Sequence, residues 1–128
     1  MIELVRDSNI SMTLKINKND IPYLLNYLDK LNKNDMLNIL FKGEKMKLEI
    51  IIDEFSNELI IKNKKIKIFM DNEELEYFIK KLNGVTEGYD FFPSELCERK
   101  VKNKYVSIYC IIIWYVCLIK VGQVLKSL

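Results

Sequence analysis

The sequence predicts one α+β domain over residues 1–128, with an antiparallel sheet that carries two helices on one face and a further helix at the C-terminus. Three observations lead to this prediction. Residues 10–17 alternate apolar and polar side chains, as half-buried strands do. Asp20 and Asp71 each precede a stretch with helical periodicity. Both stretches are followed by further strand-like sequence, an order typical of the α+β class.

Length and composition agree with a single globular domain. A chain of 128 residues can bury a sizeable core. Its hydrophobic fraction of 49% and charged fraction of 30% are ordinary globular values, which argue against a disordered chain.

The first predicted unit spans residues 10–53. Its opening strand places four apolar side chains on one face: Ile10, Met12, Leu14 and Ile16. Asp20 then has the character of an N-cap, and Pro22 falls in the first helical turn, where a missing N–H costs nothing. Two strands are expected next, over residues 36–41 and 46–53, with a hairpin turn at residues 42–44.

The second predicted unit spans residues 58–113 and follows a turn at 54–57. Strands are expected over residues 58–62 and 65–70, separated by a Lys-Asn-Lys-Lys breaker. Asp71 and Glu74 then have the spacing of a capping box, and Asn83-Gly84 is expected to end the helix. The buried stripe of this helix is expected to contain Leu75, Phe78, Ile79 and Leu82.

The two units resemble each other at a spacing of 51 residues. Asp20 matches Asp71, Leu24 matches Leu75, and Tyr27 matches Phe78. A duplicated β-α-β-β unit explains the match economically. Convergent patterning of two amphipathic helices would produce the same match, so both explanations stay open.

The C-terminal segment has three interpretations. Residues 105–119 carry no charge, yet this run is shorter than the roughly 20 residues that a membrane-spanning helix needs. The favoured interpretation is a buried strand over residues 106–113 followed by a closing helix over residues 114–128. The alternatives are membrane association of residues 105–125 and a helix that pairs two copies in a homodimer.

Charge and cysteine usage narrow the functional classes. Twenty basic and eighteen acidic residues give a net charge of +2, without the clear basic excess of a typical nucleic-acid-binding domain. Nucleic acid is therefore disfavoured as a partner. Three cysteines without CxxC spacing and an N-terminus without an apolar secretory region favour the cytoplasm.

The residues for common catalytic and metal chemistry are missing. The chain contains no histidine, so Ser/His and Cys/His catalysis and Cys/His zinc sites have no basis. Four isolated glycines do not form a phosphate-binding loop. We therefore expect no enzyme activity, no cofactor and no metal; general acid–base catalysis by a pair of carboxylates is the alternative that stays open.

Residues 87–98 are the most distinctive segment, because three aromatic side chains stand beside several carboxylates. Such a segment either fills the core with its rings or presents an aromatic anchor with an acidic rim to another protein. The second interpretation predicts a partner-binding surface of Tyr89, Asp90, Phe91, Phe92, Glu95 and Glu98, with Glu73, Glu74 and Glu76 nearby if the second helix packs beside it.

A series of short motifs runs through residues 57–110: Asn57-Glu58-Leu59, Glu73-Glu74-Leu75, Phe78-Ile79, Leu82, Gly88, Phe91-Phe92, Glu95-Leu96 and Ile108-Tyr109-Cys110. In these motifs the chain resembles a family of small bacterial immunity proteins that neutralise polymorphic or contact-dependent toxins. The histidines and the glycine pair that usually precede Glu-Leu in this family are missing here. The resemblance implies a protein that occludes a toxin and has no catalytic residues.

The expected function is therefore that of a non-catalytic inhibitor whose partner is a toxin or a nuclease. One alternative is a phage or mobile-element inhibitor of a host defence nuclease, similar to anti-CRISPR proteins. Another is a small membrane-associated protein tethered by its C-terminal apolar segment.

Overall fold

The protein is built mainly of strands, with two helices at one end. A computed structural model describes residues 2–31, 35–86 and 93–113. The elements are, in chain order, β1 (Ile2–Ser8), β2 (Ser11–Asn17), a short 3-10 turn (Lys18–Asp20), α1 (Ile21–Asp29), β3 (Leu37–Phe41), β4 (Glu44–Ile52), β5 (Leu59–Lys62), β6 (Lys65–Met70), α2 (Asn72–Thr86), β7 (Ser94–Val101) and β8 (Lys104–Ile113).

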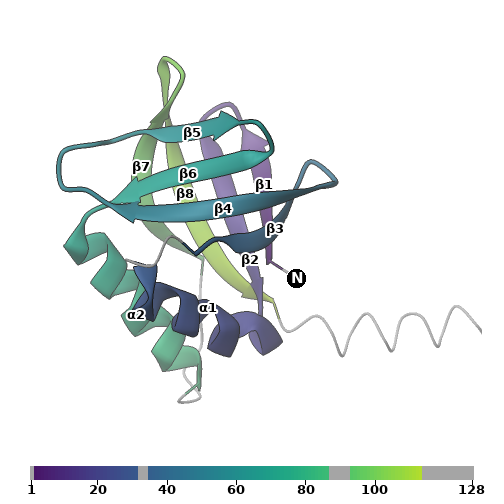
Figure 1. The fold of residues 1–128 in the computed structure, drawn as a ribbon, viewed down its shortest axis with the longest axis vertical. Coiled ribbons are helices and arrows are strands. Elements are labelled where there is room, and N and C mark those ends of the chain that lie inside the picture. Colours follow the sequence, from purple (N-terminus) through teal and green to yellow (C-terminus); the bar gives the residue numbers. More distant parts are fainter. Residues whose placement is uncertain (1, 32–34, 87–92, 114–128) are drawn as a thin grey trace, which may run out of the picture.

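The eight strands form one sheet that curves into a nearly closed barrel (Figure 1). The strand order is β5-β6-β4-β3-β1-β2-β8-β7, which leaves β5 and β7 as the two edges. These edges meet, because Glu58 and Lys100 form a parallel bridge and the Lys100 N–H donates to the Asn57 carbonyl at 2.6 Å. The two edges are therefore joined at one point, near the start of β5 and the end of β7.

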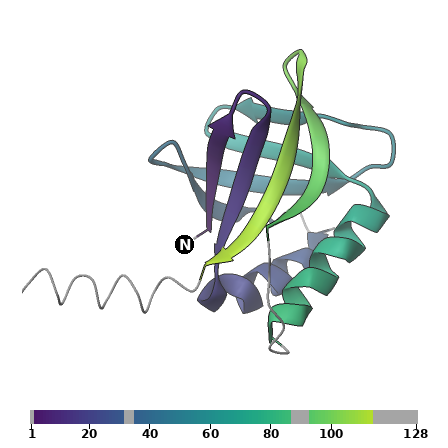
Figure 2. The same ribbon diagram turned by 180° about the vertical axis from the view of Figure 1, so that it is seen from behind.

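The predicted α+β architecture is wrong. Strand pairing is mixed, since β1–β3, β2–β8 and β4–β6 are parallel, and the helices cover one end of the barrel instead of one face of an open sheet (Figures 1 and 2). Alternating apolar residues show that one side of a strand is buried. The same alternation occurs in the strands of an open sheet and in those of a barrel, where the buried side faces the barrel interior.

Each half of the chain has the same order and pairing of elements. In both halves an antiparallel hairpin precedes the helix and a second hairpin follows it. The first predicted unit therefore lacks its opening strand, β1, whereas the second predicted unit already began with the strand over residues 58–62 that forms β5. β1 was not anticipated, since Glu3, Arg6 and Asp7 interrupt its apolar residues.

The buried faces of the strands fill the barrel interior. Met12, Leu14 and Ile16 of β2 are buried as predicted, whereas Ile10 lies in the β1–β2 turn and is 69% exposed. On β8, the predicted buried strand, Val106, Ile108, Cys110 and Ile112 are buried, while the alternate residues are half-buried. The predicted helix over residues 114–128 lies outside the described residues.

The hairpin turns at residues 42–44 and 62–65 are confirmed. Lys42 and Gly43 have φ values of 52° and 78°, and Asn63 and Lys64 have values of 54° and 59°. Two consecutive residues with positive φ match the twist of the flanking strands, which favours tight hairpins. The turn predicted at residues 54–57 does not form a hairpin, because β6 lies between β4 and β5.

Both helices pack their apolar stripes onto the open end of the barrel. Leu24 and Leu28 of α1 and Phe78 and Leu82 of α2 are buried there. The predicted end of α2 at Asn83-Gly84 is wrong, since the helix continues to Thr86. Val85 is only 2% exposed, so burial of this side chain offsets the weak helix propensity of the preceding residues.

The predicted capping box at the start of α2 is confirmed. The Asp71 carboxylate accepts from the Glu74 N–H at 2.7 Å, and the Glu74 carboxylate accepts from the Asp71 N–H at 2.9 Å. This reciprocal pair fixes where the chain leaves β6 and enters the helix.

Candidate functional site

Four of the nine residues predicted to bind a partner, Tyr89, Asp90, Phe91 and Phe92, lie outside the described residues. The structure places Glu73, Glu74 and Glu76 in the first turns of α2, and Glu95 and Glu98 on β7. The Glu73, Glu76, Glu95 and Glu98 side chains are exposed.

Glu74 has a structural position. Its carboxylate accepts hydrogen bonds from the Asp71 N–H and from the Arg99 guanidinium. Arg99, which is only 7% exposed, also donates to the carbonyl oxygens of Phe69 and Glu98. The helix start and β7 are therefore joined through Arg99. The Glu74 carboxylate thus contributes to the contact between α2 and β7.

The loop between β4 and β5, residues 53–58, presents an aromatic side chain that the sequence prediction did not include. Phe55 is 96% exposed. The loop projects beyond the ends of the strands at the left of Figure 1. The only signal in the sequence is a single phenylalanine among polar neighbours, Asp-Glu-Phe-Ser-Asn.

Hydrogen bonds within this loop hold its conformation. The Asp53 carboxylate accepts from the N–H groups of Phe55 at 2.8 Å and Ser56 at 3.3 Å. This arrangement is an Asx turn, which substitutes a side chain for a backbone turn contact. Phe55 therefore stands on a backbone that is already ordered.

Further contacts tie the loop to four other elements, β6, β7, β8 and α2. The Asp53 N–H donates to the Met70 carbonyl at 2.9 Å. The Asn72 side chain at the start of α2 donates to the Glu54 carboxylate at 3.3 Å. The Asn57 side chain donates to the Tyr105 hydroxyl at 3.3 Å, and the Asn57 carbonyl accepts from Lys100.

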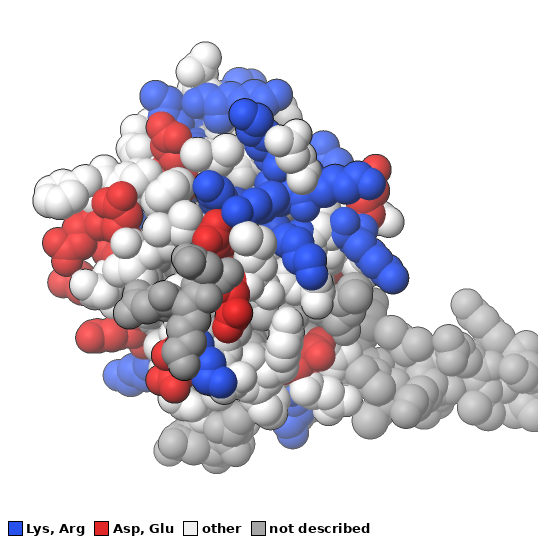
Figure 3. Space-filling model, viewed as in Figure 1, with Lys and Arg blue, Asp and Glu red and all other residues white. Residues whose placement is uncertain are grey.

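Several carboxylates lie in the same loop and at the adjoining start of α2. Glu54 and Glu58 are exposed in the same loop, and Asp53 is half-buried. Glu73 follows Asn72, the residue that contacts Glu54. Figure 3 shows acidic side chains gathered beside the β4–β5 loop and the start of α2. We call Phe55 with Asp53, Glu54, Glu58 and Glu73 the aromatic–acidic surface.

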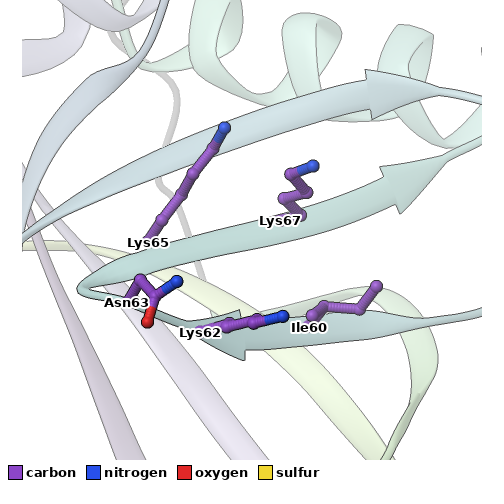
Figure 4. Close-up of a pocket in the computed structure, with 5 residues that line it drawn as sticks. All are labelled: Ile60, Lys62, Asn63, Lys65 and Lys67. Atoms are coloured by element: carbon purple, nitrogen blue, oxygen red, sulfur yellow. The ribbon is translucent and has the colours of Figure 1, made fainter.

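A second charged surface covers the outer side of β4, β5 and β6 (Figure 3). It comprises Lys45, Lys47, Lys62, Lys64, Lys65 and Lys67, and we call it the lysine face. Two shallow hollows of about 290 and 500 Å³ lie on it and share Asn63 and Lys65. Figure 4 shows the smaller hollow, which Ile60, Lys62 and Lys67 also line.

Basic side chains also surround the barrel mouth away from the helices. A hollow of about 530 Å³ is lined there by Phe41, Ile61 and Val101 and by four cations, Arg6, Lys42, Lys102 and Lys104. The positive surface thus continues from the lysine face around the turns of three hairpins.

Two groups of findings bear on chemistry and membranes. Within residues 2–31, 35–86 and 93–113, no three His, Cys, Asp or Glu side chains are grouped so that they could hold a metal ion. None of the helices in these ranges has the length and apolar character needed to cross a bilayer.

The fold and its surfaces define a small, nearly closed eight-stranded β-barrel with an ordered aromatic loop and a separate basic face. No protein-family model matches the chain, and a search of curated proteins finds no match either.

Proposed function

We propose that this protein is a non-catalytic inhibitor that binds another protein through the aromatic–acidic surface. The observation that carries the proposal is the presentation of Phe55, 96% exposed, on a loop held by hydrogen bonds at both ends. The proposed class is that of the immunity proteins, in which the inhibitor binds a toxin and occludes it.

The order of the loop is the main support. Isolated apolar side chains on a surface are common and need no function by themselves. Binding energy at interfaces nevertheless concentrates in a few anchors that enter a pocket of the partner. An anchor on a pre-ordered loop loses less entropy on binding than one on a loose loop.

The acidic rim indicates the partner's charge. Glu54, Glu58 and Glu73 would meet a basic surface, such as that of a protein that acts on phosphates. Opposite charges also accelerate the encounter of the two proteins. A toxin nuclease meets this requirement, and so does a host defence nuclease bound by a phage or mobile-element inhibitor.

The test is affinity capture of the tagged full-length chain from its native cells, with wild type and two variants. Phe55→Ala removes the proposed anchor, and Ile10→Ala removes an apolar side chain that is 69% exposed at another turn. We expect one stoichiometric partner with the wild type and with Ile10→Ala. Loss of a central aromatic anchor costs about 2 kcal/mol or more, so Phe55→Ala should bind at least about 30-fold more weakly.

The charged rim has its own test. Reversal of Glu54 and Glu58 to lysine should slow association with the captured partner and reduce its salt dependence. Equal recovery of the partner with wild type and Phe55→Ala, or no specific partner at all, would overturn the proposal. The partner's identity then separates toxin immunity from inhibition of a defence nuclease.

A further inference from the structure

We infer that the lysine face binds the phosphate backbone of double-stranded nucleic acid without reading its sequence. The proposal is independent of the aromatic–acidic surface. It rests on where the sheet places lysines that are dispersed along the chain.

Strand pairing brings the lysines together. Lys47 on β4 pairs with Lys65 on β6, and Lys65 pairs with Lys62 on β5. Lys67 lies two residues beyond Lys65 on the same side of β6. Neighbouring strands are about 4.8 Å apart and alternate residues about 6.7 Å, so these lysine residues occupy neighbouring positions of a compact grid, with Glu49 opposite Lys67.

Few carboxylates neutralise this grid. Among the outward residues paired on β4, β5 and β6, Glu49 is the acidic one, and it forms an ion pair of 3.0 Å with Lys65. Lys47 donates instead to the neutral Asn38 side chain. The Lys45, Lys62 and Lys64 side chains are exposed. The lysine face therefore keeps a positive field even though the whole chain is nearly neutral.

Composition alone does not explain the arrangement. Lysine is abundant throughout the chain, with Arg6 and Arg99 as the two arginines. Yet the outward residues of the paired strands β2 and β8 include Thr13, Ser107 and Tyr109, with Lys15 paired beside Glu3. A bias in composition raises the number of lysines but does not gather them on one side of the barrel.

The shape and the residue types indicate an extended polyanion. The two hollows are shallow and adjoin, so they suit a chain of phosphates better than a small molecule. Lysine contacts phosphate as a point charge, whereas base recognition depends on bidentate side chains such as arginine. Among the described residues that line these hollows, none is an aromatic side chain on which single-stranded bases could stack. Duplex binding through phosphates alone is the mode that remains.

The experiment is fluorescence anisotropy with a labelled 20-base-pair DNA duplex of mixed sequence, titrated with the full-length chain at several salt concentrations. Each neutralised phosphate contributes about −0.9 to the slope of log K against log salt, so four to five contacts predict a slope of about −4. A duplex of different sequence should bind within about twofold.

Two triple variants separate the lysine face from overall charge. Lys45→Gln, Lys62→Gln and Lys67→Gln remove three charges from the face, and Lys15→Gln, Lys30→Gln and Lys80→Gln remove three elsewhere. Both change the formal net charge from +2 to −1, that is 2 − 3. We expect the first to lose at least tenfold in affinity and about 2.7 in slope, and the second to stay within about threefold. Phe55→Ala should bind DNA like the wild type.

Three results would overturn the inference. One is no binding of the wild type to the duplex at 50 mM salt. Another is an equal loss in both triple variants, which would show a long-range charge effect without a site. The third is displacement by poly-glutamate as effective as displacement by DNA at equal charge, which would assign the face to acidic proteins.

Discussion

Arg99 on β7 forms an ion pair with Glu74 in the first turn of α2, and the same Glu74 oxygen accepts from the Asp71 N–H. Through its other nitrogen atoms Arg99 reaches the carbonyls of Phe69 and Glu98. One nearly buried guanidinium thus joins β6, β7 and the helix start. Arg99 therefore connects the wall of the barrel to α2, the helix that covers one end of the barrel.

Replacement of Arg99 by alanine should be strongly destabilising. Removal of one partner from a buried ion pair costs about 3–5 kcal/mol, because the Glu74 carboxylate and two backbone carbonyls lose their donor. Glu74→Gln keeps an acceptor for the Asp71 N–H and should cost less, about 1–2 kcal/mol. Urea unfolding followed by circular dichroism measures both. A cost below about 1 kcal/mol for Arg99→Ala would contradict the structural role of this residue.

Loss of the capping box should be visible without any change in the core. Asp71→Ala removes the acceptor of the Glu74 N–H and should lower the free energy of unfolding by about 0.5–2 kcal/mol. Glu73→Ala is the matched control, since it removes one exposed negative charge from the same helix end. Equal destabilisation by the two variants would mean that the helix dipole, and not the cap, is responsible.

The same substitution should destabilise the protein strongly at one phenylalanine and hardly at all at another. Phe78 is fully buried between α2 and the barrel, so Phe78→Ala should cost about 3–5 kcal/mol. Phe55 is 96% exposed, so Phe55→Ala should change the free energy of unfolding by no more than about 0.5 kcal/mol. Thermal and urea unfolding give the comparison. A large cost at Phe55 would show that this ring packs against the protein and is not available to a partner.

The buried thiols should make the protein less stable at alkaline pH. Burial raises the pKa of the Cys97 and Cys110 thiols to about 12. In the unfolded chain a thiol titrates near 8.5, so each thiol contributes full stability below that pH. This stability is lost progressively as pH rises from about 8.5 toward 12, by at most about 1.4 kcal/mol per pH unit and thiol.

The comparison that isolates this effect is between wild type and the Cys97→Ala, Cys110→Ala double variant, unfolded in urea at pH 8 and pH 10. Lysine and tyrosine titration is common to both proteins. We expect the wild type to lose more stability between the two pH values than the variant does. An equal loss of stability in both proteins would show that the pKa values of the two thiols do not differ between the folded and the unfolded state.

Local structure followed closely from local sequence. Alternation along residues 65–70 predicted β6, and Asp71 with Glu74 predicted the cap of α2. The turn at Asn63-Lys64 likewise forms as its flanking residues indicated. Each of these features depends on contacts within a few residues, which a single sequence displays directly.

The order of the strands in the sheet could not be predicted from the sequence. Nothing in residues 46–62 shows that β6 inserts between β4 and β5, because strand pairing depends on contacts between distant segments. The end of α2 was missed for a similar reason. Asn83 and Gly84 favour termination locally, and the burial of Val85 against the rest of the protein overrides them.

The surfaces divide in the same way. The sequence by itself determined that Lys65 and Lys67 alternate with Ile66 and Ile68, and so lie on the opposite side of the strand from these apolar residues. It also indicated that an aromatic residue beside carboxylates would suit a protein partner. The tertiary structure placed Lys65 between Lys47 and Lys62, and it identified Phe55 as the most exposed aromatic side chain among the described residues. The physical reason is that hydrophobic periodicity reports which side of a strand is buried, whereas the closure of the barrel decides which strands become neighbours.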